Sequence, residues 1–415
     1  MIKKVIIILL ASTAVVGGAA AAFGPNLARN FAPQFFIARA VLNTSQEFTP
    51  FLWAARDILP QVQSQPLQLE TSLTINRVDG SLIGNIPAAI TPALQLLTIQ
   101  NTTRLDAAWD NLANSLNLQM AGTTLLNADF TLNRQQLLLN VPAIFDFNLA
   151  IDPRRLGSEL NESALTGMVL PANLIDDELF YYFYSQLFLQ RQQINVQGFI
   201  NSAITMATNA NFEYIGRNED SHVFRVIPTM NDASTAANFI LEGTAFAEDP
   251  IIDLGIIGNR LSFATVIANF SINGILTPIY LEIYFTGTGE AEYEILFPNG
   301  TVAGNLAVTE QADHSRLNFT VAITTDATAT ATGTVQLYPQ DWRIVGSFAN
   351  LTITTPDIDI TLNGNYSLQA DYQPIIFNTA EARTLAQLGI FDLLGGMARL
   401  SESPIGGILG DLILP

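Results

Sequence analysis

The sequence has 415 residues, of which 49% are hydrophobic and only 13% are charged, and its formal net charge is −19. Its only lysines, Lys3 and Lys4, stand at the N-terminus, which argues against nucleic acid or an anionic membrane surface as a partner because both attract clustered basic side chains. Cysteine is absent, which excludes a disulfide framework, a thiolate metal site and a lipid-modified N-terminal cysteine.

The first two dozen residues have the three regions of a secretory signal. Lys3 and Lys4 precede the apolar run at 5–23, which ends in the alanines of 19–22. The sequence therefore predicts an exported protein, located in the periplasm, at the cell surface or outside the cell. The apolar run is nearly as long as the roughly 20 residues needed to cross a bilayer. Two outcomes stay open: cleavage of the signal, or an uncleaved transmembrane anchor in which residues 5–23 make the only membrane contact.

Two short helices are predicted between Asn26 and Pro60. Apolar residues recur at helical spacing in the first helix, and Thr49 followed by Pro50 is typical of an N-cap and first helical position for the second. Pro60 is expected to end the second helix.

From Leu67 the hydrophobic period changes to two. Apolar residues alternate with polar ones from Leu67 to Asn76, and the same alternation returns at 126–132 and 145–151. This pattern predicts antiparallel strands with one buried and one wet face.

An aromatic-rich helix is predicted in the middle of the chain. Asp176, Asp177 and Glu178 favour a helix start, and the segment 179–188 is apolar or aromatic nearly all round, so it needs cover on most sides. We expect it either to be buried against the sheet or to roof an apolar cavity, with tyrosine hydroxyls at the mouth. The candidate ligand-binding residues are Leu179, Phe180, Tyr182, Phe183, Tyr184 and Leu187.

Strand patterns fill most of the second half. A hairpin is predicted over Asn211 to Pro228, and tight turns are predicted at Asn299-Gly300 and Asn363-Gly364. A helix start is predicted at Asn378 and a helix end at Gly389. Further strands are predicted at 239–246, 261–272, 279–285, 291–297, 301–308, 317–323, 358–362 and 366–372.

Catalytic motifs are missing from the sequence. The two histidines, His222 and His314, are isolated, and Asp220-Ser221-His222 cannot act as a triad because neighbours on a strand point to opposite faces. No metal-ligand set and no phosphate-binding glycine loop is present. The sequence therefore predicts a protein that is not an enzyme and that needs no cofactor or metal.

The segment Ala38 to Thr44, together with Leu126 to Asn133 running into Leu137 to Pro142, resembles exported bacterial proteins of unknown function that have a lipoprotein-carrier-like curved antiparallel sheet. In that family the concave sheet face and its helices shelter an acyl chain, which is what the resemblance implies here. This chain departs from the family in lacking the lipid-anchoring cysteine and in being longer than a single carrier domain.

The expected fold is α+β and β-dominated, with one or two large antiparallel curved sheets covered by helices and an N-terminal export or anchor helix. The predicted segments are 1–24 (signal or anchor), 25–210 (helix pair, sheet and aromatic helix), 211–377 (a meander that continues the sheet or forms a second one) and 378–415 (C-terminal helices and tail).

The expected function is non-catalytic binding of a lipid or other apolar ligand, such as an acyl chain, between the concave sheet and its helices. The alternative is a cell-surface structural or interaction protein without a small-molecule ligand. Asn-x-Ser/Thr sequons favour the alternative, and the oligomeric state stays open.

Overall fold

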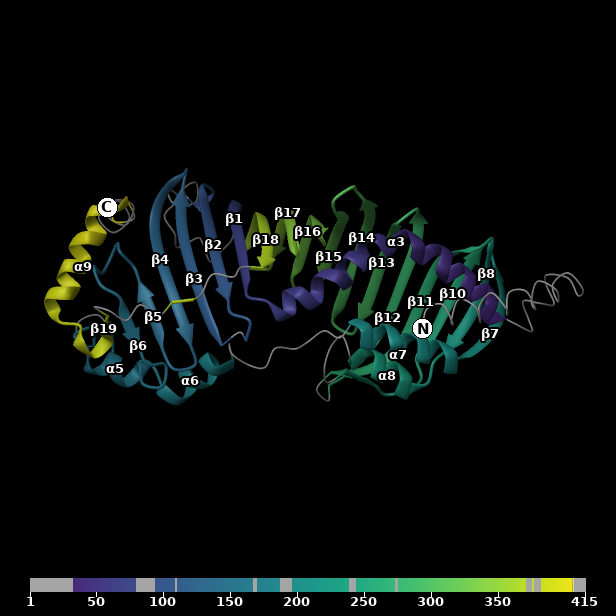
Figure 1. Ribbon diagram of the computed structural model, residues 1–415, viewed down its shortest axis with the longest axis horizontal. Coiled ribbons are helices and arrows are strands. Elements are labelled where there is room, and N and C mark those ends of the chain that lie inside the picture. Colours follow the sequence, from purple (N-terminus) through teal and green to yellow (C-terminus); the bar gives the residue numbers. More distant parts are fainter. Residues whose placement is uncertain are drawn as a thin grey trace, which may run out of the picture. The chain divides into compact units, whose positions relative to one another are not determined.

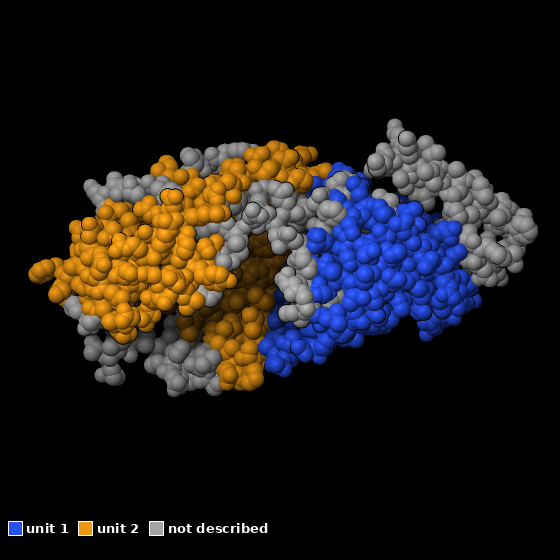
Figure 2. Space-filling model, turned by 90° about the horizontal axis from the view of Figure 1, so that it is seen from below, with its two compact units in different colours: residues 1–56, 193–332 blue, residues 57–192, 333–415 orange. Residues whose placement is uncertain are grey.

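The structure is a computed structural model that describes residues 33–79, 94–108, 110–166, 170–186, 196–238, 244–272, 275–370, 375–376, 382–404 and 406. The chain divides into two units (Figure 2). Unit 1 comprises residues 1–56 and 193–332, and unit 2 comprises residues 57–192 and 333–415. The predicted signal or anchor at 5–23 lies outside the described residues. The sequence-based segment boundaries stay predictions.

Helix α3 (Pro33–Ser64) is a single helix where two were predicted. Pro50 and Pro60 lie inside it, although an interior proline removes a backbone hydrogen bond and costs about 3 kcal/mol. Burial on both sides of Pro50 explains why the helix continues. Ala40 is 0% exposed before it, and Ile58 is 0% exposed after it. The packing of this apolar stripe therefore outweighs the local helix-breaking signal.

The sheet of unit 1 is antiparallel, and its strands pair in the order β7-β8-β10-β11-β12-β13-β14-β15. Short strand β9 pairs with the end of β11. The strands are β7 (Asn211–Asn218), β8 (Ser221–Ile227), β9 (Thr244–Phe246), β10 (Ile251–Ile257), β11 (Arg260–Ile272), β12 (Ile275–Gly287), β13 (Glu290–Phe297), β14 (Gly300–Glu310) and β15 (Ser315–Thr324). The helices are α7 (Val196–Asn209) and α8 (Met230–Asn238). Strand β16 (Thr328–Tyr338) follows in the chain.

The core of unit 1 forms where the first part of α3 packs on the sheet. Ile37 and Ala40 of the helix contact a buried cluster that includes Phe224 of β8 and Leu254 of β10. Phe36 stacks on Phe224 with ring centroids 6.4 Å apart. The predicted stripe of this helix included Val41 and Leu42, but these are 40% and 46% exposed, and the buried face is the one that carries Ile37 and Ala40.

The sheet of unit 2 brings distant segments together. Strand β1 lies between β18 and β2 (Figure 1), and it is antiparallel to both. The pairing then runs β2-β3-β4-β5-β6, and β19 adds a short parallel pairing to β6. The strands are β17 (Arg343–Thr354), β18 (Asp359–Ala370), β1 (Leu67–Asp79), β2 (Leu97–Leu105), β3 (Asn111–Met120), β4 (Thr123–Asn133), β5 (Leu137–Asn140), β6 (Leu149–Ile151) and β19 (Arg383–Thr384).

The helices of unit 2 are α5 (Leu156–Glu162), α6 (Asp177–Gln186), the short 3₁₀ helix η2 (Leu385–Gln387) and α9 (Ile390–Glu402). A buried cluster joins Leu149 and Ile151 of β6 to Leu385 and Leu388. The C-terminal segment therefore packs on the short strands of this sheet.

Several local predictions differ from the structure. Asn363-Gly364 is not a turn, because both residues lie inside β18. Gly364 pairs with Phe348 of β17, and a Cβ on it would come within 2.3 Å of the Phe348 ring. Glycine is therefore needed here for close packing of an aromatic ring. Gly389 is the N-cap of α9 and not a helix end.

Other predictions were incomplete. Strands β2 and β3 were not predicted, and only 149–151 of the segment 145–151 forms a strand. The segment predicted as a strand at 239–246 is described only at β9, and the predicted helix start at Asn378 lies outside the described residues.

The β-dominated, antiparallel fold is confirmed. The prediction that helices cover the sheets is wrong beyond α3, which packs on the sheet of unit 1. Leu179 and Tyr182 of α6 are 57% and 60% exposed, and Phe391 of α9 is 88% exposed. Both helices therefore leave large apolar side chains exposed. Within the described part of the chain, no helix has the length and apolar character needed to cross a membrane.

Candidate ligand-binding groove

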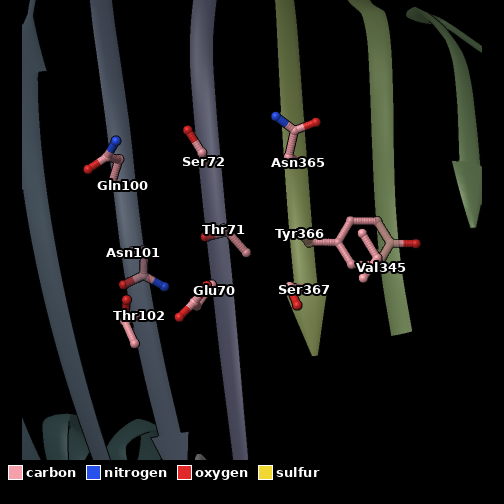
Figure 3. Close-up of a pocket in the computed structure, with 10 residues that line it drawn as sticks. All are labelled: Glu70, Thr71, Ser72, Gln100, Asn101, Thr102, Val345, Asn365, Tyr366 and Ser367. Carbon is pink, nitrogen blue, oxygen red and sulfur yellow. The ribbon is translucent and has the colours of Figure 1, made fainter. Parts of the chain in front are cut away.

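A pocket of about 350 Å³ lies on the sheet of unit 2. This volume is at the lower end of the range of small-molecule sites, about 300–1,000 Å³. Four adjacent strands, β17, β18, β1 and β2, supply its lining (Figure 3). The lining residues are Glu70, Thr71, Ser72, Gln100, Asn101, Thr102, Val345, Asn365, Tyr366 and Ser367.

Strand register places most of these residues in two rows that cross the strands. We call the set Val345, Ser367, Glu70 and Thr102 the Glu70 row, because each residue is paired with the next across the sheet. We call the set Asn365, Ser72 and Gln100 the Ser72 row, on the same grounds. The two rows are two residues apart on every strand, so their side chains share one face. Figure 3 shows the rows at separate levels across β18, β1 and β2.

The row between them forms the floor of the groove. Tyr366, Thr71 and Asn101 are paired across β18, β1 and β2, and alternation places their side chains on the opposite face. Contacts agree with this placement for Asn101, whose amide nitrogen donates to the Thr103 hydroxyl at 3.0 Å and whose oxygen accepts from Asn114 at 2.6 Å. The groove therefore has walls of side chains and a floor of backbone.

Gly346 gives room to the Tyr366 ring on that opposite face. The two residues are paired, and a Cβ on Gly346 would come within 2.1 Å of the ring. The ring therefore lies flat across β17 and is not directed between the two rows. Recognition in the groove must rest on hydrogen bonds and not on aromatic stacking.

The walls are rich in hydroxyl and amide groups. Ser72, Thr102 and Ser367 carry hydroxyls, and Gln100 and Asn365 carry amides that both donate and accept. Among the residues of the two rows that line the pocket, only Glu70 has an ionisable side chain. A nearly uncharged wall with both donors and acceptors suits a neutral ligand that carries many hydroxyls.

A chain of side-chain hydrogen bonds orients Glu70. The Arg104 Nε donates to Gln68 Oε1 at 3.0 Å, and Gln68 Nε2 donates to Glu70 Oε1 at 2.6 Å. Because Arg104 takes the Gln68 oxygen, the Gln68 amide nitrogen is directed at Glu70. Gln68 thus engages one carboxylate oxygen of Glu70, and the residue remains exposed to solvent.

The residues predicted to bind a ligand lie elsewhere, on α6. Leu179 and Tyr182 are exposed, whereas Tyr184 is 6% exposed and its hydroxyl donates to the carbonyl of Asn133 at 2.5 Å. Burial raises the pKa of the Tyr184 hydroxyl well above its usual range. Phe180 stacks on Tyr184 with centroids 6.0 Å apart. Tyr184 therefore anchors α6 to the β4–β5 turn. The Phe183 side chain and Leu187 lie outside what the structure describes.

The histidines are placed in structural contacts. His222 Nδ1 lies 2.9 Å from the Tyr214 hydroxyl, while Ser221 bonds to Ser262. His314 Nδ1 lies 2.7 Å from Asp313. Among the residues that the structure describes, no group of three or more His, Asp or Glu side chains could hold a metal ion.

Comparisons with known proteins give no family. No family model and no curated protein matches this chain. Solved structures that match include a Rhodopseudomonas blastica porin variant, with 7% identity, 74% of this chain and 98% of that chain covered, and a TM-score of 0.23. An outer membrane protein of Vibrio cholerae, OmpT with a loop deletion, matches with 7% identity, 73% and 97% coverage and a TM-score of 0.19.

The expected resemblance to lipoprotein carriers is wrong. The strands of each unit form an antiparallel sheet, and the aromatic helix α6 does not shelter a pocket, because its Leu179 and Tyr182 are 57% and 60% exposed. The expected binding of an apolar ligand beneath this helix is wrong, because these two side chains are directed into solvent and not toward a ligand. The alternative of a cell-surface structural or interaction protein without a small-molecule ligand is not supported either.

The groove was missed because only part of its lining was predicted to lie on strands, and the strands that carry Gln100, Thr102 and Val345 were not predicted. Glu70 and Ser72 belong to the first predicted strand, but their neighbours Ser367 and Asn365 come almost 300 residues later. The alternation of polar and apolar residues in the first strand can be recognised in the sequence. The pairing of this strand with β18 and β2, which aligns the polar residues into two rows, cannot.

Proposed function

We propose that this protein is an exported, non-catalytic binding protein that recognises a neutral, hydroxyl-rich ligand, a carbohydrate, in the groove of unit 2. The observation that carries the proposal is the pair of hydroxyl- and amide-bearing rows flanking a pocket of about 350 Å³. Each sugar hydroxyl can donate and accept, so it needs a wall that offers both, and the amides of Gln100 and Asn365 do so.

Charge supports a neutral ligand over an ionic one. The two rows of the pocket contain no basic side chain that could pair with a phosphate or carboxylate, and the chain as a whole is strongly acidic. Glu70 suits a hydroxyl donor, because a carboxylate accepts such hydrogen bonds strongly.

Calorimetric titration with a panel of neutral oligosaccharides tests the proposal on the full exported chain. We expect binding to at least one of them, and a loss of about tenfold or more when Gln100→Ala and Asn365→Ala are combined, since two hydrogen bonds of about 1 kcal/mol each are removed. Asn305→Ala is the matched control, because this exposed asparagine lies on β14 in unit 1. Equal binding by the double variant and the parent would refute the groove as the site.

The location outside the cytoplasm is part of the proposal. It is supported by the lysines, apolar run and small residues that open the sequence. Fractionation of the source cells with N-terminal sequencing of the product distinguishes a cleaved, released protein from one anchored through residues 5–23. A full-length product in the cytosol would contradict both.

A further inference from the structure

The two rows do not end at the pocket. Thr102 of the Glu70 row is paired with Ser115 of β3, which is paired with Asp129 of β4. Gln100 of the Ser72 row is paired with Asn117 of β3, which is paired with Asn127 of β4. Polar side chains therefore continue the same two rows across two further strands.

The extension has the same chemistry as the pocket. Ser115, Asn117 and Asn127 carry a hydroxyl and two amides, and Asp129 adds a carboxylate. The next residue along the Glu70 row, paired with Asp129 on β5, is Asn140. From β18 to β4 the rows contain two carboxylates and no basic side chain.

One atom in this extension has no hydrogen-bond partner among the residues that the structure describes. It is the side-chain oxygen of Asn117, which is shielded from solvent. Its neighbour in the row, Gln100, has its own oxygen engaged by the Gln119 amide at 3.1 Å. A shielded acceptor without a donor is unfavourable, and a ligand hydroxyl that donates to Asn117 would remove that cost.

The dimensions favour a chain-like ligand. Neighbouring strands lie about 4.8 Å apart, so the four steps from β18 to β4 span about 19 Å. That is longer than one sugar ring, and the direction of the rows is perpendicular to the strands. We infer that the groove binds a linear, uncharged oligosaccharide that crosses strands β18, β1, β2, β3 and β4, and that Asn117 and Asn127 contact its far end. This inference rests on the proposed function.

The carboxylates of the two rows also limit the charge that the ligand can carry. Glu70 and Asp129 both belong to the Glu70 row, on β1 and β4. Their negative charges would repel an acidic polysaccharide. A neutral chain meets only hydrogen-bonding groups along the groove. The inference therefore excludes polyanionic glycans as occupants.

The test is a length series of neutral linear oligosaccharides, from disaccharide to hexasaccharide, measured by calorimetry against the full chain. We expect affinity to rise at least tenfold along the series. Asn127→Ala should lower the affinity for the hexasaccharide at least threefold and leave the affinity for the disaccharide unchanged, whereas Gln100→Ala should weaken both. Asn127 is exposed, so its replacement should leave the fold intact, and circular dichroism with a melting curve checks this.

The outcomes separate the inference from the proposed function. If short ligands bind through Gln100 but affinity does not grow with length, or Asn127→Ala weakens short and long ligands equally, the extension is refuted and the pocket stands. If an acidic oligosaccharide binds as well as a neutral one of equal length, the argument from the carboxylates fails. If no neutral oligosaccharide binds at all, the proposed function fails and the extension with it.

Discussion

The carboxylate of Asp177, the first residue of α6, caps the N-terminus of a different helix at Gly157. Its Oδ1 accepts from the Gly157 N–H at 2.5 Å and from the Ser158 N–H at 3.2 Å, and the Ser158 hydroxyl donates to its Oδ2. The first N–H groups of a helix have no partner within it, so this carboxylate satisfies α5 from outside. Asp176 takes over the cap of α6 itself, accepting from Leu179 at 2.8 Å.

We predict that Asp177→Asn lowers the free energy of unfolding of the protein by about 1–2 kcal/mol, because the cap loses its charge-assisted hydrogen bonds. Urea denaturation followed by circular dichroism measures it. Glu178→Gln, an exposed neighbour on the same turn, is the control and should change little. A stability loss as large in the control would contradict a specific cap.

The same carboxylate predicts an acid dependence. The Ser158 hydroxyl and the backbone donors of 157 and 158 lower the pKa of Asp177 below its ordinary value of 3.8. Its contribution is therefore fully present above pH 3.8 and is lost as the pH falls through the lowered pKa. Acid titration of the parent and of Asp177→Asn should show a stability difference at pH 6 that narrows below pH 3.8.

The contribution of Glu159 to stability should depend on pH with the opposite sign to that of Asp177. It is 5% exposed, and burial raises its pKa above 4.5, with Arg155 partly opposing the shift. A buried carboxyl with a raised pKa stabilises the fold in its protonated form, so its contribution is present below pH 4.5 and is lost as the pH rises through the raised pKa. Glu159→Gln should therefore raise the melting temperature at pH 7.5 more than at pH 4.5. An equal shift at both values would contradict this reading.

The ion pair between Glu47 and Arg260 should help to hold α3 on the sheet of unit 1. The Arg260 Nη2 lies 2.6 Å from the Glu47 carboxylate, which also accepts from the Gly289 N–H at 3.0 Å. Glu47→Ala should cost about 2 kcal/mol, because a largely buried carboxylate is removed from two hydrogen bonds. The exposed Gln46→Ala on the same helix is the control. Thermal unfolding of both variants compares them, and matching losses would contradict the prediction.

Gly346 predicts a steric effect beside the groove. A Cβ there would come within 2.1 Å of the Tyr366 ring, so Gly346→Ala should destabilise the protein by about 1–3 kcal/mol. Combining it with Tyr366→Ala should recover part of the loss. Gly395→Ala on helix α9 is the control, because its Cβ would meet only Arg399 at 3.7 Å, and we expect a gain of up to about 1 kcal/mol.

Sequence patterns predicted local structure well where local forces decide it. The alternation from Leu67 predicted β1, and the polar tip at Gly216 to Ser221 predicted the β7–β8 hairpin, because a strand with one wet face repeats every two residues. The patterns failed where packing decides. Pro50 lies inside α3 because buried residues on both sides hold the helix, and Asn363-Gly364 lies inside β18 because the Phe348 ring needs the space.

The candidate site could not be predicted for a related reason. Glu70 and Ser72 were correctly assigned to the polar face of a strand, but a groove needs neighbours, and those come from β18 and β2 through register alone. The aromatic segment around Leu179 was a stronger signal in the sequence, yet its helix is exposed on one side and anchored by Tyr184 on another. The amino-acid composition of a segment shows where apolar side chains are concentrated. It does not show which surfaces of the folded protein contact one another.

The pairing of β1 with β18 has a consequence for biogenesis. Residues 67–79 cannot find this partner until residues 359–370 have been synthesised and exported, so a central strand pair of unit 2 is among the last contacts that can form. Contacts this distant in sequence close slowly, and until then β1 has a free edge whose N–H and C=O groups can pair with another chain. Chains that stop before residue 359 should accumulate as aggregates or be degraded, and a nascent full-length chain should depend on chaperones that keep this edge covered.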